Sequence, residues 1–263
     1  MSAFDPTRAA AVLHALRRSR ARVAPLDPTV APRTEAEGAA AQRALAQLTG
    51  DDPPGGFKIG ATARQMQEYL GLAGPVAGYM SARRIYPDGS ALRVADFVAL
   101  GAECEVAVRL ARDLPPAPCS AERAASAVGE LFAAIELVEN RYGELAALGS
   151  PTLIADQVFH AAAVIGAARA DRWHGLDFAR LTGRIRVDGV TRGEGLASDL
   201  LGHPMNSLAW LAGSELAATF GGLRAGQVVL LGSVTPPIWL DRACTVAVEF
   251  DRLAPVSVTL GAG

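Results

Sequence analysis

One lysine stands alone in this chain. Lys58 is the only lysine among 263 residues, and the remaining 24 of the 25 lysine and arginine side chains are arginine. It lies in Gly55–Gly60, which reads Gly-Gly-Phe-Lys-Ile-Gly. An ammonium is compact and can give up its proton when it is desolvated, whereas a guanidinium stays charged. We therefore predict that Lys58 transfers protons, with a snorkelling surface lysine as the alternative interpretation.

Three glutamates suggest a metal site. Glu103 and Glu105 belong to Gly-Ala-Glu-Cys-Glu-Val-Ala-Val, and side chains at i and i+2 leave the same face of a strand. Two neighbouring carboxylates repel each other unless a proton or a cation lies between them. Glu136 occurs in a second apolar run, where an unpaired charge would be costly. Together they favour Mg²⁺ or Mn²⁺, whereas a solvated strand face is the alternative for Glu103 and Glu105.

The elements that would position these side chains fall into two parts. Residues 5–22 and 34–48 predict helices, with Asp5 and Thr34 as their N-caps. After residue 55, short apolar runs divided by glycine, proline and aspartate predict strands over residues 57–59, 103–110, 131–138, 183–187, 228–231 and 245–250. Further helices are predicted over residues 63–70, 121–129 and 203–220. We expect an α+β fold, with a helical segment over residues 1–54 and a catalytic domain over 55–263.

Composition narrows the function. Half of the residues are hydrophobic, the net charge is -2, and no basic run with interleaved aromatic residues occurs, so we expect no nucleic-acid partner. Arginines interrupt the apolar character of the N-terminus, and no stretch has the roughly 18 apolar residues that a membrane span needs. Three widely spaced cysteines suit reduced thiols. We therefore expect a cytoplasmic protein that acts on a small molecule.

Four short motifs occur in an order that is informative about the family of the protein. They are Gly-Phe-Lys-Ile-Gly, Glu-Cys-Glu, Ile-Glu-Leu-Val and Leu-Gly-His-Pro-Met-Asn. In this order they resemble the fumarylacetoacetate hydrolase superfamily, in the branch that contains 2-keto-4-pentenoate (2-hydroxypenta-2,4-dienoate) hydratases and 4-oxalocrotonate decarboxylases. The resemblance covers roughly residues 55–260. It implies a mixed β-sheet roll and a homo-oligomer.

The resemblance also implies roles for single residues. It assigns Mg²⁺ or Mn²⁺ to Glu103, Glu105 and Glu136, and it places Lys58 in the active site for proton transfer or for holding the reacting water. We expect desolvation beside a metal to lower the pKa of Lys58. Asp156, in Ile-Ala-Asp-Gln, is expected to orient Lys58 or a metal-bound water, and a helix N-cap is the alternative.

Other side chains are candidates for contact with the substrate. Ser233 and Thr235 follow a predicted strand and could bind a substrate carboxylate, unless they serve the turn alone. Arg83 and Arg84 stand where many hydratases of the family carry an acidic residue; a guanidinium pair suits a second carboxylate on the substrate, and solvated turn residues are the alternative. His160 lies in an apolar run and is interpreted as a hydrogen-bonded core histidine.

A metal ion together with Lys58 would support chemistry on a 2-oxo acid. Three functions are compatible with this chemistry. The first is hydration of a 2-hydroxy-2,4-dienoate to a 4-hydroxy-2-oxo acid. The second, suggested by the two arginines, is decarboxylation of a 2-oxo-enedioate or hydrolytic C–C cleavage of an acylpyruvate. The third is a catalytically silent subunit of an enzyme complex, for which loss of metal binding would be the sign.

Overall fold

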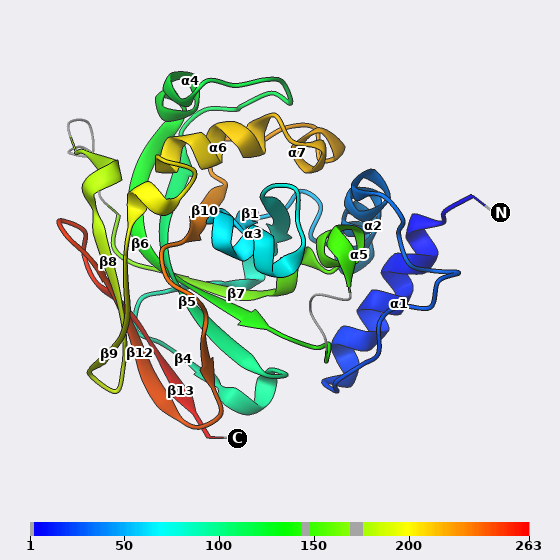
Figure 1. The fold of residues 1–263 in the computed structure, drawn as a ribbon, viewed down its shortest axis with the longest axis horizontal. Coiled ribbons are helices and arrows are strands. Elements are labelled where there is room, and N and C mark those ends of the chain that lie inside the picture. The colour runs from blue at the N-terminus through cyan, green and yellow to red at the C-terminus, as the bar shows by residue number, and fades with distance from the viewer. Residues whose placement is uncertain (1–2, 144–147, 169–175, 263) are drawn as a thin grey trace.

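Two β-sheets, flanked by helices, form the frame of the protein. A computed structural model describes residues 3–143, 148–168 and 176–262 (Figure 1). The helices are α1 Pro6–Ser19, α2 Glu35–Thr49, α3 Arg64–Leu70, α4 Ala121–Ser126, α5 Gly149–Ala155, α6 Pro204–Ala212 and α7 Glu215–Thr219. The strands are β1 Gly56–Gly60, β2 Val76–Met80, β3 Ile85–Pro87, β4 Ser90–Arg93, β5 Leu100–Leu110, β6 Val128–Glu139, β7 His160–Ile165, β8 Thr182–Val187, β9 Val190–Leu196, β10 Val228–Ser233, β11 Ile238–Leu240, β12 Cys244–Phe250 and β13 Val256–Gly261.

The larger sheet is curled. Its order is β2-β1-β10-β5-β6-β7-β3, with β11 paired to β5. In a flat sheet, six strand spacings of about 4.8 Å would place β3 about 29 Å from β2. The chain from Met80 to Ile85 can reach only about 17 Å, at roughly 3.4 Å per residue. The two ends of the sheet therefore approach each other, and the predicted mixed roll is confirmed.

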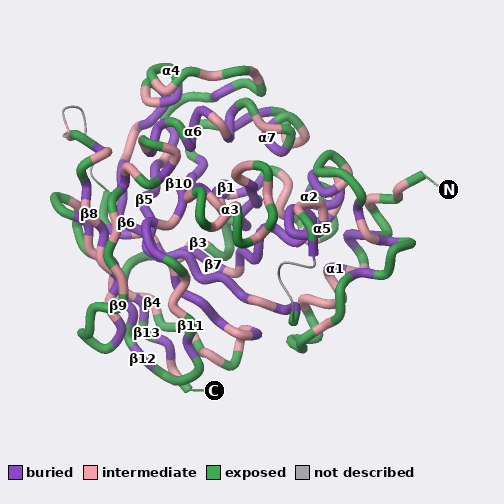
Figure 2. The backbone as a smooth tube through the Cα atoms, viewed as in Figure 1, coloured by how far each residue is buried: buried purple, intermediate pink, exposed green. Residues whose placement is uncertain are grey.

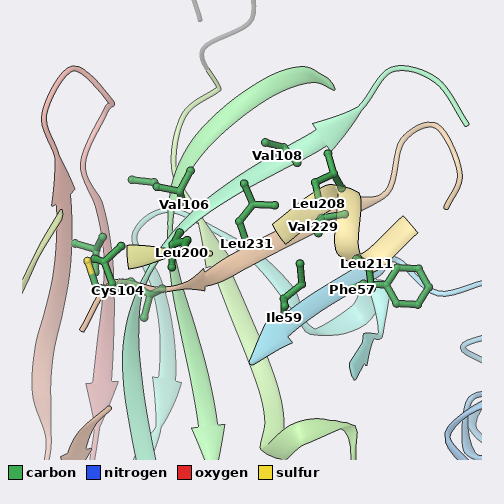
Figure 3. Packing of buried hydrophobic residues seen from close by; sticks show 14 of the residues in the cluster. Phe57, Ile59, Cys104, Val106, Val108, Leu200, Leu208, Leu211, Val229 and Leu231 are labelled. Carbon is green, nitrogen blue, oxygen red and sulfur yellow. The ribbon is translucent and has the colours of Figure 1, made fainter. Parts of the chain in front are cut away.

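The two faces of the curled sheet bury different sets of side chains. On the outer face, Phe57, Val229 and Leu231 pack near Leu208 and Leu211 of α6 (Figure 3). On the inner face, one apolar cluster combines side chains from β2, β5, β6, β7 and β10, namely Met80, Ala107, Phe132, Ala134, Ala163, Val228 and Leu230. Side chains from so many strands meet on one face only where the sheet curls around them.

The strands of the smaller sheet are ordered β4-β13-β12-β8-β9. Its apolar side chains belong to the same core cluster as those on the outer face of the larger sheet. Figure 2 shows buried backbone through the middle of the roll and exposed backbone along the connecting loops. Gly195 of β9 lies under the loop after β10, where a Cβ would come within 1.9 Å of the Val234 carbonyl oxygen. Glycine at position 195 is thus explained by close backbone packing.

The N-terminal helices form a cluster of their own. Ala9, Leu13, Ala41 and Leu45 pack together between α1 and α2, and Ala155 at the end of α5 joins them. Asp5 accepts hydrogen bonds from the Thr7 and Arg8 amides, and the Thr34 hydroxyl accepts one from the Glu37 amide, so both predicted N-caps are confirmed. The boundary between residues 54 and 55 stays a prediction.

Two predicted helices needed correction. The helix expected over residues 203–220 ends at Ala212, because Gly213 and Ser214 interrupt it and the Ser214 hydroxyl caps α7. The helix expected over 121–129 stops at Ser126, because β6 begins at Val128. Within residues 3–143, 148–168 and 176–262, every helix is too short or too polar to span a lipid bilayer.

Candidate metal and catalytic site

Three carboxylates meet inside the curled sheet. Glu103 of β5 lies directly opposite Glu136 of β6, and Glu105 follows two residues later on the same strand. Among the residues that the structure describes, these three offer one carboxylate oxygen each, all within 4.8 Å of one another. Glu105 and Glu136 are fully buried, whereas Glu103 is partly exposed. The predicted metal ligands are therefore brought together.

Each buried carboxylate has one held oxygen and one free oxygen. Glu136 Oε1 lies 3.1 Å from Lys58 Nζ and 2.9 Å from His160 Nδ1. Glu105 Oε2 accepts a hydrogen bond of 2.7 Å from the Gly232 amide, at a shift in the pairing of β10 with β5. Glu136 Oε2 and Glu105 Oε1 are buried and have no partner within the described ranges. Such orphaned oxygens fit a hard divalent cation.

The electrostatics of the cluster also calls for a cation. Burial and the nearby Glu136 charge raise the pKa of Glu103 to about 8. The pKa of Glu105 is raised well above its usual value, by burial and by the charges of Glu136 and Glu103. Burial acts in the same direction on Glu136, but Lys58 and His160 outweigh it and lower its pKa. The Lys58 ammonium thus neutralises Glu136. Glu103 and Glu105 retain their protons unless a metal ion takes the place of those protons.

Lys58 is buried within this cluster. Its side chain is 3% exposed, and β1 directs it into the roll beside Glu136. Burial lowers the pKa of Lys58, but the charges of Glu136, Glu103 and Glu105 outweigh burial and raise it. The metal-free arrangement therefore favours the charged ammonium, because three carboxylates surround it, and a lowered pKa beside a bound metal stays a prediction. The surface-lysine alternative is excluded.

Asp156 lies in a different network from the one expected. Its Oδ1 accepts a hydrogen bond of 2.8 Å from Arg17 Nε, and its Oδ2 accepts one of 2.8 Å from Arg141 Nη2. Arg141 is itself buried and also pairs with Glu139. Asp156 makes no side-chain cap to the short helix that follows it, so the N-cap alternative is wrong. A catalytic role for Asp156 stays a prediction, while its contacts bind α1 to the roll.

The side chains predicted to contact the substrate differ in whether their polar atoms already have hydrogen-bond partners. Arg83 Nη2 donates to Asp51 Oδ1 at 2.9 Å and to the Thr49 carbonyl at 2.7 Å. The Ser233 hydroxyl donates to the Thr235 carbonyl at 2.7 Å. Thr235 Oγ1 is buried and has no partner among the described residues. Thr235 thus keeps a free hydroxyl, while the polar groups of Arg83 and Ser233 already have partners; substrate binding by all three stays a prediction.

Two cavities lie beside residues that connect to the carboxylate cluster. One of about 570 Å³ is lined by Thr62 and by residues of α3 and of the loop around Leu201. Thr62 packs on Gly232, where a Cβ would lie 2.4 Å from Thr62 Oγ1, and the Gly232 amide in turn holds Glu105. The other cavity, of about 550 Å³, lies between α1 and the roll, with Arg83, Arg84 and His160 in its wall.

Sequence reasoning missed the contact between His160 and Glu136. His160 is hydrogen-bonded, as expected, but its partner is a candidate metal ligand rather than a core backbone group. The only signal in the sequence was the place of His160 at the start of an apolar run. The structure shows that this run, β7, pairs with β6, the strand that carries Glu136. Arg17 and Arg141 carried no comparable signal, because the separation of Arg17 from Asp156 is 139 residues.

Comparison with known proteins agrees with this geometry. Residues 57–260 match the family described as fumarylacetoacetate (FAA) hydrolase C-terminal. The chain is 32% identical over 204 residues to a 2-keto-4-pentenoate hydratase of Burkholderia vietnamiensis, covering 78% of this chain and 77% of that protein. It is also 32% identical over 183 residues to a 2-hydroxyhexa-2,4-dienoate hydratase of Comamonas testosteroni, covering 69% and 68%. The chain belongs to the fumarylacetoacetate hydrolase family.

A solved structure supports the fold. The 4-oxalocrotonate decarboxylase of Pseudomonas putida G7, complexed with magnesium and adipate, superimposes with a TM-score of 0.84 over 100% of both chains, at 20% sequence identity. The similarity extends over the N-terminal helices as well as the roll. The α+β architecture predicted from sequence is thus shared along the whole chain.

Asp156→Ala tests the buried ion-pair network. The substitution leaves the Arg141 guanidinium buried with one carboxylate fewer, so the free energy of unfolding should fall by about 3–5 kcal/mol. Urea denaturation followed by circular dichroism measures the change. Asp96→Ala, which removes a carboxylate from exposed arginines, is the control and should lower stability much less. Equal effects of the two substitutions would contradict the structural role assigned to Asp156.

Metal binding should depend on pH. Mg²⁺ or Mn²⁺ binds the ionised forms of Glu103 and Glu105, whose pKa values are raised in the metal-free site. Binding must therefore displace protons, and affinity should rise as the pH increases toward and through the Glu103 pKa of about 8. Calorimetric titration of Mn²⁺ in buffers of different ionisation enthalpy measures both affinity and proton release. Affinity independent of pH would contradict the assignment.

Proposed function

We propose that the protein is a hydro-lyase that uses Mg²⁺ or Mn²⁺ to add water to a 2-hydroxy-2,4-dienoate, giving a 4-hydroxy-2-oxo acid. The observation that carries the proposal is a charged Lys58 beside three carboxylates, two of which keep a free buried oxygen. The two relatives named as dienoate and pentenoate hydratases support it. A bound divalent cation would supply Lewis acidity toward the carboxylate and the 2-oxygen of the substrate.

The residues of the chain divide the remaining work. Glu103, Glu105 and Glu136 would hold the cation, and before a cation binds their charges raise the pKa of Lys58. Lys58 Nζ would donate a proton to a carbon of the dienol, and the neutral amine would then take a proton from the water that adds to the substrate.

The first cavity suits the substrate. At about 570 Å³, it lies in the range of small-molecule sites, about 300–1,000 Å³. Thr62 in its wall contacts Gly232, which links the cavity to Glu105. We propose that the tail of a small 2-oxo acid occupies it. The proposed assembly is a homo-oligomer, for which the exposed Leu48 on α2 offers an apolar contact.

Lys58→Arg tests the proton-transfer role. Arginine keeps the positive charge but does not give up a proton near neutral pH, so turnover should fall by at least about 100-fold. The measurement is the loss of ultraviolet absorbance of a 2-hydroxy-2,4-dienoate in the presence of Mg²⁺ or Mn²⁺, with thermal unfolding to verify that the variant is folded. Full activity of Lys58→Arg would remove the proton-transfer role. Unchanged absorbance with the wild-type protein would reject the hydratase.

A second candidate function rests on Arg84. Its guanidinium has no ion pair among the described residues and faces the cavity of about 550 Å³ beside Arg83. A second substrate carboxylate would suit it, as in a 2-oxo-enedioate decarboxylase or an acylpyruvate hydrolase. Measurement of CO₂ and pyruvate release across a panel of diacids should then show product that falls about 10-fold or more in Arg84→Ala. No product from any diacid would reject this alternative.

A silent subunit is the least supported function. Three carboxylates remain in place around Lys58, and among the described residues Glu105 and Glu136 each keep a buried oxygen without a partner. A protein that bound neither Mg²⁺ nor Mn²⁺ would favour this alternative.

A further inference from the structure

His160 connects the candidate metal site to the second cavity. Its side chain is 3% exposed, and Nδ1 lies 2.9 Å from Glu136 Oε1. A carboxylate oxygen only accepts hydrogen bonds, so Nδ1 carries the hydrogen in this contact. The other ring nitrogen, Nε2, is buried and has no partner within the described part of the chain. All of the polar contact of His160 is thus directed at one candidate metal ligand.

An unusual turn places His160 there. Gln157, Val158 and Phe159 have φ angles of 56°, 52° and 63°, a left-handed conformation that is uncommon for a β-branched or aromatic residue. Gln157 Nε2 donates to the Tyr79 carbonyl at 2.7 Å, which fixes the turn to β2. The turn ends where the pairing of β6 and β7 shifts register beside His160. Strained backbone of this kind persists where the surrounding structure enforces it, often at functional sites.

His160 and Lys58 share the same carboxylate oxygen. Lys58 Nζ lies 3.1 Å from Glu136 Oε1, and Oε2 remains free. A buried oxygen without a hydrogen-bond partner is costly. If Lys58 were the sole partner, any movement of its amino group toward a substrate would leave Oε1 without one. With His160 present, Oε1 keeps a donor and the carboxylate keeps its orientation.

We infer that His160 is a positioning residue for Glu136, holding Oε1 so that Oε2 faces the metal and Lys58 is free to act on the substrate. This inference rests on the metal-dependent function proposed above. It assigns His160 no contact with substrate.

Two amide substitutions give a matched test. The amide nitrogen of asparagine stands the same number of bonds from Cα as Nδ1 of histidine, whereas that of glutamine stands one bond farther. His160→Asn should therefore keep the donor to Glu136 and bind Mn²⁺ with nearly wild-type affinity. His160→Gln should bind Mn²⁺ about 10- to 100-fold more weakly, as expected when a group that orients a metal ligand is lost.

Calorimetric titration of Mn²⁺ into each full-length protein gives the result without substrate. Thermal unfolding in the absence of metal reports stability separately, and His160→Ser, whose hydroxyl is too short to reach Glu136, replaces the glutamine variant if that variant does not fold. Equal Mn²⁺ affinity in all variants would overturn the inference, and so would equal weakening by Asn and Gln. If the wild-type protein itself bound no Mn²⁺, the proposed metal-dependent function would fail, and the inference with it.

Discussion

Three carboxylates and a single ammonium lie together inside a curled sheet, and this imbalance of charge governs the site. Lys58 compensates Glu136, and two carboxylates remain that burial keeps protonated in the absence of a cation. Ionised groups in such a place must be paired or must bind a metal. The arrangement is therefore stable in two forms, with protons or with a cation, and the metal-bound form is the one suited to chemistry on a 2-oxo acid.

The fold supplies this site through its curl. The inner face is apolar along Ala107, Ala134 and Leu230, so the polar cluster is confined to one part of the roll. On one side, the Gly232 amide holds Glu105 at a shift in strand pairing. On the other side, a left-handed turn directs His160 toward Glu136. Glu105 and Glu136 are each held by one oxygen, which leaves the second oxygen without a partner among the described residues.

The sequence predicted which residues form the site better than it predicted the contacts between them. The period of two residues placed Glu103 and Glu105 on one face, and the order of motifs added Lys58 and Glu136. The direction of the Lys58 pKa shift was not predictable, because it depends on how many carboxylates the fold brings within reach. The role of His160 depends on a strained turn, and strain of this kind has no periodic signature.

The same limit explains the N-terminal part of the chain. Its helices and caps were predicted from local signals and were confirmed. The contact that joins them to the roll, from Arg17 to Asp156, spans 139 residues and could not be read from either motif alone. Asp156 was interpreted through its neighbours in sequence, whereas its partners come from α1 and from the segment after β6.

The most direct test of the central claim is anomalous X-ray diffraction from crystals grown with Mn²⁺. We predict one manganese peak among Glu103, Glu105 and Glu136, bound through Glu105 Oε1 and Glu136 Oε2, the two oxygens of the cluster that are buried without a partner among the described residues. Absence of a peak there, in crystals whose carboxylates are ordered, would contradict the account.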